Sequence, residues 1–415
     1  MKVTVIGSGG REHALAWKLA QSPLCEALWA EAPVADAEPG VYTLPPVQGP
    51  EELAQFCRDH GMDLVVIGPE APLAAGWADV LRERGVTVFG PSARGAQLES
   101  SKWFAKKFMQ CNGIPTADFT VCESLSQVER ELEHFPIVPV LKYDGLASGK
   151  GVAVPNTREE ALSFARKIFE KGESTHLLLE ERLFGEEVSL LAITDGTTVV
   201  ILPPTRDHKR LHEGDKGPNT GGMGAFTPVD GCDFAWVKQI EELVFTPFLR
   251  GIHAEGIDYR GVIYAGLMLT NAGPRVLEFN CRLGDPETQP LMCAIEDDLL
   301  PLFFSAARGK LVHRTFSTRA ALCVVLASEG YPAAAQTGVS IEGLQEAAAM
   351  ENVKIFHAGT RRVNHGFVTR GGRVLGVTGV GDTLKDASRA AYCAAEKIHF
   401  TGMHMRRDIG KFNNV

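Results

Sequence analysis

The chain has 415 residues, of which 45% are hydrophobic and 22% are charged, and its net charge at neutral pH is −9. This length exceeds one ordinary domain and suggests roughly two to four. The acidic balance excludes an extended surface for duplex nucleic acid, although a local basic pocket for phosphate stays possible. We therefore expect a folded protein whose partners are small molecules and not nucleic acid.

Nine cysteines form no C-x-x-C pair, so we expect reduced thiols and no cysteine-based metal site. No segment reaches the roughly 18 apolar residues that a membrane-spanning helix needs. The first residues follow a strand pattern and not that of a signal peptide. These features predict a cytoplasmic protein with no membrane partner, and we favour a monomer.

The N-terminal region alternates strand and helix patterns. An apolar run at 3–6 is followed by a glycine turn and by helical spacing over 11–19, and further strands are expected at 28–30, 63–67 and 86–89. This order predicts a doubly wound parallel sheet that ends near residue 100. The strand-to-helix turn offers main-chain donors and helix-dipole charge to a phosphate, through Ser8, Gly9, Gly10 and Arg11.

Two other interpretations of this turn stay open. A nicotinamide-binding G-x-G-x-x-G series that begins at Gly7 would need glycine at position 12, where this chain has Glu12. The turn is also compatible with a tight bend that binds no ligand. The mismatch at Glu12 makes the dinucleotide interpretation the weaker of the two.

A second domain is expected to begin at Ser101, with an amphipathic helix over 102–109. A strand over 136–142 then leads into a glycine-rich loop, Gly145–Gly151, and another strand. Backbone N–H groups of such a loop can close over phosphates, while Lys142 and Lys150 add positive charge. The spacing is not that of a Walker loop, and a solvated surface hairpin is the alternative.

Three later stretches carry polar groups suited to chemistry. Glu180 and Glu187 follow strand patterns and suit an adenine edge and ribose hydroxyls, although a solvated acidic turn is the alternative. Basic residues near 207–210 precede a glycine-rich stretch, 217–225, in which we expect no regular element. That stretch suits a phosphoryl or carboxylate group, and a flexible linker is its alternative.

The third stretch, 275–289, is expected to begin as a strand that places Glu278, Asn280 and Arg282 on one face. A carboxylate beside an amide oxygen suits Mg²⁺, which binds a few such groups together with phosphate oxygens. Arg282 would then hold an acid substrate. Polar alternation on an exposed edge strand is the alternative.

Taken together, the motifs resemble the glycinamide ribonucleotide synthetase family of ATP-grasp ligases over nearly the whole chain. The segments that carry the resemblance are VIGSGGREHALAWKL, IGPEAPL, KYDGLASGKGV, DHKR, GPNTGGMGA, YAGLM, EFNCRLGDPETQ, FHAGT and RRDIG.

The resemblance implies an α/β and α+β chain with an ATP-grasp fold. The expected parts are an N-terminal Rossmann-like domain (1–100), an ATP-grasp domain (101–312) with a lid (about 115–185), and a C-terminal α+β domain (313–415). It also implies ATP with Mg²⁺ or Mn²⁺ as cofactors and glycine and 5-phosphoribosylamine as substrates. The expected chemistry is ligation through a glycyl phosphate in purine biosynthesis.

The resemblance also assigns site residues. It places ATP at Lys102, Lys142, Gly145, Ser148, Gly149, Lys150, Gly151, Glu180, Glu181, Leu183 and Glu187. It places the substrates at Ser8, Gly9, Gly10, Arg11, Arg210, Asn219, Thr220, Gly221, Arg282 and Asp285. The metal is expected at Glu278 and Asn280, and catalysis at Arg282, Asp207 and Lys209.

One segment departs from the family. A proline-glycine-asparagine loop usually follows the second strand, whereas this chain places Glu31 and Asp36 there. Their negative charge would oppose phosphate binding. A ligase with a shifted acid or amine and a non-catalytic nucleotide-binding relative are therefore the alternatives. The C-terminal domain carries no strong catalytic pattern, and we leave its role unassigned.

Overall fold

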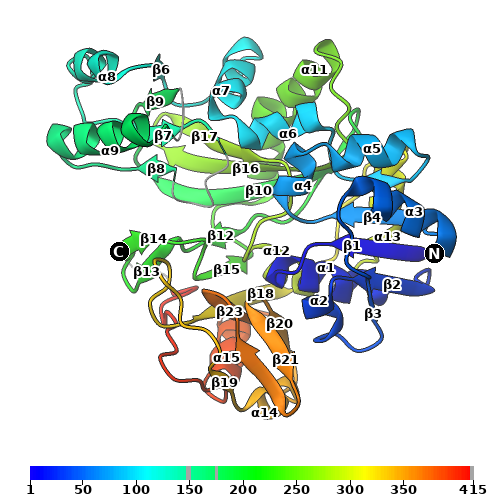
Figure 1. Cartoon of the computed structure of the whole chain (residues 1–415). Coiled ribbons are helices and arrows are strands. Elements are labelled where there is room, and N and C mark those ends of the chain that lie inside the picture. The colour runs from blue at the N-terminus through cyan, green and yellow to red at the C-terminus, as the bar shows by residue number, and fades with distance from the viewer. Residues whose placement is uncertain (146–150, 173–175, 412–415) are drawn as a thin grey trace.

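The computed structural model describes residues 1–145, 151–172 and 176–411. It has an N-terminal domain, a central region with a projecting lid, and a C-terminal domain (Figure 1). No helix in the described ranges is both long and apolar enough to cross a membrane.

The N-terminal domain is a five-stranded parallel sheet in the order β3-β2-β1-β4-β5. The sheet confirms the doubly wound topology expected from sequence, and it places the ends of β1 and β4 on one edge. Its elements are β1 (Lys2–Ile6), α1 (Gly10–Ala20), β2 (Ala27–Ala30), α2 (Ala32–Ala35), β3 (Tyr42–Thr43), α3 (Pro50–His60), β4 (Leu64–Ile67), α4 (Glu70–Ala74), α5 (Trp77–Glu83), β5 (Val88–Phe89) and α6 (Ala93–Ser100).

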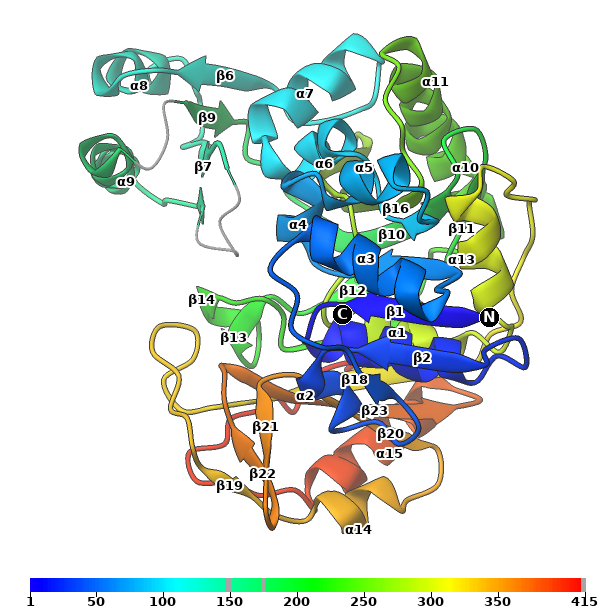
Figure 2. The same ribbon diagram turned by 45° about the vertical axis from the view of Figure 1, so that its right-hand side comes forward.

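The lid is a four-stranded antiparallel sheet, β6-β9-β7-β8, with two helices packed beside it. It projects away from the N-terminal domain in both ribbon views (Figures 1 and 2). Its own small apolar core is built on Leu141, Leu177 and Leu179. Its elements are β6 (Phe119–Cys122), α8 (Leu125–Leu132), β7 (Val140–Tyr143), β8 (Val152–Ala153), α9 (Arg158–Lys171) and β9 (Leu177–Glu180).

The larger half of the central region contains an antiparallel sheet, β11-β10-β16-β17. Its central strands are almost wholly buried because helices cover them. The elements are α7 (Lys102–Cys111), β10 (Glu186–Thr194), β11 (Val199–Ile201), α10 (Phe234–Ile240), a π-helical turn (Glu241–Phe245), α11 (Thr246–Ala254), β16 (Gly261–Thr270), β17 (Gly273–Asn280), α12 (Thr288–Ala294) and α13 (Leu300–Ala307).

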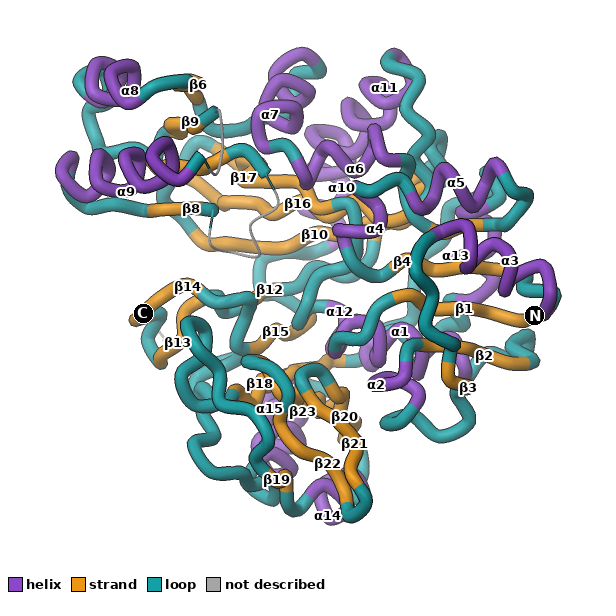
Figure 3. The backbone as a smooth tube through the Cα atoms, viewed as in Figure 1, coloured by secondary structure: helices purple, strands orange, loops and turns teal. Residues whose placement is uncertain are grey.

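A five-stranded sheet, β12-β15-β18-β23-β20, contains strands of both the central region and the C-terminal domain and joins the two. Its strands are β12 (Arg206–Asp207), β15 (Gly224–Thr227), β18 (Ala320–Ala327), β20 (Val353–His357) and β23 (Arg373–Gly381). The hairpin β13 (Arg210–His212) and β14 (Lys216–Asn219) lies beside it (Figure 3). The remaining elements are β19 (Ser340–Ile341), α14 (Leu344–Ala348), β21 (Thr360–Val363), β22 (Gly366–Thr369) and α15 (Leu384–Ala395).

Two local expectations were wrong. The glycine-rich stretch 217–225 is not free of regular structure, since β14 and β15 take up its two ends by pairing with β13 and with β18. The strand expected from residue 275 ends at Asn280, so Arg282 lies beyond it and not on the same strand face. In both cases the bounds of the strands depend on which strands pair in the fold, and local composition does not reveal those partners.

Candidate active site

One group of buried charges lies where the lid meets the larger half. Lys142 of β7 and Lys106 of α7 both lie 2.9 Å from Glu180 Oε2 of β9. Lys142 also donates to the carbonyl of Leu277, 2.9 Å away. The other carboxylate oxygen, Glu180 Oε1, is buried without a partner in the described residues. A buried acceptor in this state suits a donor such as an adenine amino group.

Glu278 of β17 lies at the centre of the site's positive charge. Burial alone would raise the pKa of Glu278, but the charges of Lys209, Lys142 and Lys102 hold that pKa below its ordinary value. These lysines come from three separate segments of the chain. The arrangement keeps a carboxylate ionised beside several cations, which suits a metal bridging to phosphate oxygens.

The donor chemistry at this point fits a magnesium ion. Glu278 and Asn280 are two residues apart on β17, and Mg²⁺ commonly takes only one or two protein oxygens besides phosphate and water. Among the described residues no cluster of three or more His, Cys, Asp or Glu side chains offers a complete all-protein site. A metal here would therefore depend on phosphate ligands.

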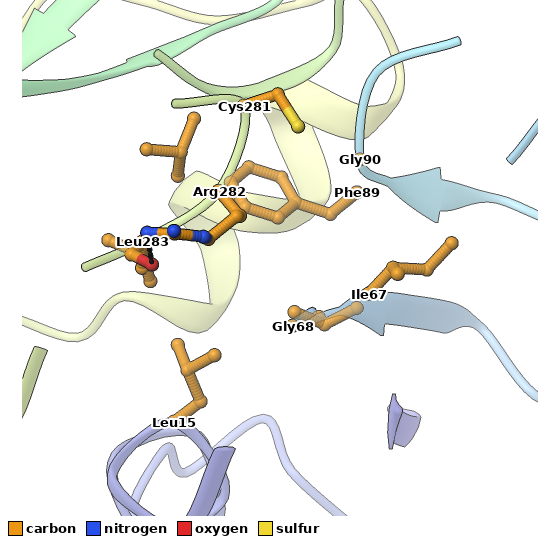
Figure 4. A pocket seen from close by; sticks show the side chains of 10 residues that line it. Leu15, Ile67, Gly68, Phe89, Gly90, Cys281, Arg282 and Leu283 are labelled. Atoms are coloured by element: carbon orange, nitrogen blue, oxygen red, sulfur yellow. Dashed lines mark hydrogen bonds between the residues drawn. The ribbon is translucent and has the colours of Figure 1, made fainter. Parts of the chain in front are cut away.

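Arg282 is held firmly by neighbouring acids. Its Nη2 lies 2.8 Å from Glu99 Oε1 and its Nε lies 3.2 Å from Glu70 Oε2. Its Nη1 donates to the carbonyl of Leu283, and both residues line a small cavity of about 10 Å³ (Figure 4). The two carboxylates raise the pKa of Arg282 although burial opposes them. Arg282 thus supplies a fixed positive charge.

Asp207, at the end of β12, carries an unusual carboxyl group. Its Oδ1 is buried and has no partner among the described residues. Burial and the charge of Glu287 raise the pKa of Asp207 well above its ordinary value. The carboxyl faces the backbone of the glycine-rich stretch, since a Cβ on Gly222 would lie 2.7 Å from Oδ1. A raised pKa makes this carboxylate a stronger base than an exposed aspartate.

Lys209 and the glycine-rich stretch lie next to Asp207. Lys209 Nζ lies 3.0 Å from Glu187 Oε2, and the negative charges of Glu187 and Glu278 raise the pKa of this lysine. Thr220 donates from its N–H and from its hydroxyl to the carbonyl of Lys209, over 2.7 Å and 2.8 Å. The loop is therefore tied to the lysine by main-chain contacts.

The strand-to-helix turn of the N-terminal domain is lined by carboxylates. Gly7 N–H donates to Glu31 Oε1 over 2.9 Å, and Gly9 N–H donates to Glu12 Oε2 over 2.8 Å. Arg11 is paired with Glu12 as well. A Cβ on Gly68 would lie 2.3 Å from Glu12 Oε1, so the glutamate fills the space beside the turn. This packing leaves no room for the close approach that a dinucleotide turn requires.

Arg373 of β23 connects the C-terminal domain to the segments that carry Gly221 and Asp285. Its Nη2 lies 2.9 Å from Asp285 Oδ2, and its Nη1 donates to the carbonyls of Asp285 and Gly221. Gln289 donates to Asp285 Oδ1, and a Cβ on Gly10 would lie only 2.8 Å from Gln289 Nε2. Segments from all three domains therefore meet at Asp285.

The roles expected for the site residues stay predictions, and the structure gives their positions. Ser148, Gly149 and Lys150 lie outside the described residues. Gly145 accepts a hydrogen bond from Lys102 Nζ, 2.8 Å away, which links helix α7 to the lid loop. The remaining expected residues lie in these elements or next to them. Gly151 precedes β8, Glu181 and Leu183 follow β9, Arg210 begins β13 and Asn219 ends β14.

The sequence did not single out Lys106, Glu99 or Arg373, and it marked Glu12 only as a mismatch to a dinucleotide turn. Lys106 and Glu12 sit inside helical patterns that read as ordinary amphipathic helices. Arg373 is the first residue of a strand far along the chain. Its link to Asp285 became visible only from the tertiary contact.

Comparison with known proteins agrees with this geometry. Residues 1–99 match the N domain of phosphoribosylglycinamide synthetase, residues 100–288 its ATP-grasp (A) domain and residues 321–412 its C domain. A phosphoribosylamine–glycine ligase from Rhodopirellula baltica is 44% identical, over 98% of this chain and 96% of that protein. The chain belongs to the phosphoribosylglycinamide synthetase family.

Solved structures extend the comparison. The crystal structure of phosphoribosylamine–glycine ligase from Thermotoga maritima has a TM-score of 0.86 and 38% identity, covering 99% of this chain and 100% of that one. A biotin carboxylase domain from Hydrogenobacter thermophilus, solved with MgADP, has a TM-score of 0.72 at 15% identity, covering 97% of this chain and 91% of that one. The second likeness shows the shared ATP-grasp fold alone. Membership in this ATP-grasp family implies that the chain binds ATP.

Proposed function

We propose that this chain is a phosphoribosylamine–glycine ligase that joins glycine to 5-phosphoribosylamine at the expense of ATP. The observation that carries the proposal is the convergence of Lys102, Lys142 and Lys209 on Glu278. It supports a site that neutralises phosphate charge between the lid and the larger half. The family named above supplies the substrates, and the relatives' names give them as glycine and phosphoribosylamine.

In the first step a carboxylate oxygen of glycine forms a bond to the γ-phosphorus, and the bond to the β-phosphate oxygen breaks to release ADP. Phosphoryl transfer of this kind needs alignment and charge stabilisation more than an enzyme nucleophile. Lys102 and Lys142 would hold the phosphates, and Glu180 would orient the adenine. Glu278 and Asn280 would hold Mg²⁺, which supplies further neutralisation of phosphate charge.

In the second step the amine nitrogen of phosphoribosylamine bonds to the carbonyl carbon of glycyl phosphate, and the carbon–oxygen bond to phosphate breaks. The nitrogen must lose a proton, and Asp207 is suited to take it because its pKa is raised by burial and by Glu287. Lys209 and Arg282 would balance the charge on the departing phosphate. Asn219, Thr220 and Gly221 would hold the glycyl group through main-chain contacts.

The phosphoribosylamine would lie against Ser8–Arg11 and Asp285. The positive end of helix α1 would face the phosphate, although Glu31 and Glu12 already accept from the N–H groups of Gly7 and Gly9 in the turn before the helix. The departure at residues 31–37 is the specific reason to keep a ligase with a different amine as the second candidate. Glu31 replaces a neutral loop residue of the family with a charge that opposes phosphate.

The test measures ADP release by the purified protein with Mg²⁺, ATP, glycine and freshly generated phosphoribosylamine. Each component is omitted in turn, and the product is identified by mass. Release that requires all of them, with glycinamide ribonucleotide as product, supports the proposal. Release that depends on glycine alone, with no product from phosphoribosylamine, would instead support the second candidate and point to the 31–37 segment.

A further inference from the structure

The hairpin β13–β14 connects the two parts of the site that would handle glycine. Lys209 precedes its first strand, Asn219 ends its second, and Thr220 to Gly222 follow. Its own residues are mostly exposed, and none from Arg210 to Asn219 is buried. An apolar core therefore does not fix its position, and polar contacts must do so.

Those contacts come from the far end of the chain. Arg406 has a side chain that is only 1% exposed, and its Nη1 donates to the carbonyl of Arg210 over 3.1 Å. The same nitrogen lies 2.8 Å from Asp215 Oδ1, in the turn of the hairpin. The Nε and Nη2 atoms of Arg406 donate to the two oxygens of Asp408, each over 2.7 Å. One guanidinium thus binds the base and the turn of the hairpin together.

The residues around Arg406 repeat this pattern. Asp408 Oδ2 accepts from Gly214 N–H over 2.8 Å, and Arg407 N–H donates to Glu213 Oε1 over 3.0 Å. His404 Nε2 lies 2.9 Å from the carbonyl of Leu211. Four residues of the C-terminal segment, His404 and Arg406 to Asp408, therefore contact the hairpin, and the last three of them begin the RRDIG motif.

Hydrogen bonds from the C-terminal domain also reach the glycine-rich stretch. Tyr331 accepts from Gly221 N–H over 2.8 Å, and Arg373 donates to the carbonyl of the same glycine. Thr220 links this loop back to the carbonyl of Lys209. A shift of the hairpin would therefore move Lys209 and the loop together. Figure 2 shows β13 and β14 between the lid and the C-terminal domain, where such a shift would reach the site.

We propose that Arg406 and Asp408 are positioning residues. The C-terminal segment 404–408 holds Lys209 and the loop 219–222 at the positions from which they contact glycine. This inference deepens the proposed function and rests on it for the identity of the acid. It also gives the C-terminal domain a role in placing the residues that would hold the glycyl group, in addition to packing. Neither residue is expected to contact a substrate.

The kinetic test compares Arg406→Lys and Asp408→Asn with the unaltered chain in ADP release. Arg406→Lys keeps the charge but cannot bind both oxygens of Asp408 and the carbonyl of Arg210 at once. We expect KM for glycine to rise about tenfold or more, because small misplacement of a positioned group has large effects. KM for ATP should change by less than about twofold, because Lys102, Lys142 and Glu180 lie outside both the hairpin and the segment 404–408.

Arg407→Gln is the matched control. Its guanidinium lies 2.9 Å from Glu396 within the C-terminal domain, and only its backbone N–H contacts the hairpin. This variant should keep both KM values. A purely structural role for Arg406 would lower the active fraction, so kcat would fall with both KM values unchanged. That result, in folded Arg406→Lys and Asp408→Asn, would overturn the proposal.

Hydrogen exchange gives a test that does not depend on turnover. In Asp408→Asn the amides of Gly214, Thr220 and Gly222 should exchange faster, by about tenfold or more, while those of β1 and β4 keep their protection. Unchanged exchange at all three amides would also overturn the proposal. If the unaltered protein showed no glycine-dependent ADP release, the proposed function would fail, and the exchange result would still decide whether the segment holds the hairpin. Asp215→Asn, an exposed partner of Arg406, serves where Arg406→Lys does not fold.

Discussion

Lys106 Nζ lies 2.9 Å from Glu180 Oε2, and both side chains are almost fully buried, at 2% and 3% exposure. The pair connects helix α7 of the larger half with strand β9 of the lid. Lys106 also donates to Thr116 Oγ1 over 2.7 Å, at the start of the chain that leads into the lid. The pair therefore connects the larger half to strand β9 and to the segment that leads into the lid.

Removing one partner of this pair should be costly. Lys106→Met leaves Glu180 with one lysine fewer, and we expect the free energy of unfolding to fall by about 3–5 kcal/mol. KM for ATP should rise more than KM for glycine. Denaturant unfolding and steady-state kinetics measure the two effects, and the adjacent exposed Lys107→Met is the control. Equal stability of the two variants would contradict the prediction.

The same lysine predicts a pH dependence of stability. Burial lowers the pKa of Lys106 from 10.5 to about 8. The folded state therefore releases this proton near pH 8, while the unfolded state keeps it up to about pH 10.5. Between these values the unfolded state binds more protons, so the free energy of unfolding rises with pH, by up to about 3 kcal/mol. Denaturation at several pH values should show this rise in the unaltered chain and not in Lys106→Met.

Glu278→Gln should separate nucleotide binding from turnover. The substitution removes a proposed metal ligand but leaves the surrounding lysines, which still attract phosphates. We expect kcat to fall by about 100-fold or more, while ATP still binds. Calorimetric binding of ATP and the rate of ADP release test this directly. Glu296→Gln, at an exposed position, should leave both unchanged, and a normal kcat in Glu278→Gln would remove Glu278 from the site.

Asp207→Asn should affect only the second step. Formation of glycyl phosphate, trapped by hydroxylamine as the hydroxamate, should keep its rate within about threefold, because Asp207 takes no part in phosphoryl transfer. Amide formation with phosphoribosylamine should fall by about 100-fold or more, as expected for loss of a general base. Asp230→Asn, exposed and remote, is the control. Equal loss of both steps would assign Asp207 to glycine binding instead.

Gly222→Ala should destabilise the glycine-rich stretch. Gly222 has φ of +110°, and a Cβ there would lie 2.4 Å from Pro286 Cδ and 2.7 Å from Asp207 Oδ1. We expect a loss of about 2–4 kcal/mol in unfolding free energy together with lower activity. Gly231→Ala also has positive φ, but nothing lies within 4 Å of its Cβ. It should cost only about 1 kcal/mol, and a similar cost for both variants would show that backbone strain alone decides.

Local patterns in the sequence predicted much of the molecule. Alternating strands and helices predicted the parallel sheet of the N-terminal domain, because burial on both faces leaves continuous apolar runs such as Leu64–Ile67. The mismatch at Glu12 argued against a dinucleotide turn, and the structure shows why, since that carboxylate fills the space beside Gly7 and Gly68. The nucleotide and metal candidates Lys142, Glu180 and Glu278 also came from local pattern and resemblance.

Contacts between distant segments could not be predicted in this way. The pairing of Lys106 with Glu180, of Arg282 with Glu99 and of Arg373 with Asp285 each joins residues far apart in the chain. Strand and helix periodicity tells which face a side chain lies on but not which element packs against that face. The sequence by itself thus determined the types of element and the candidate chemistry. The tertiary structure decided which charges balance one another, because electrostatic interaction depends on distance and burial in space.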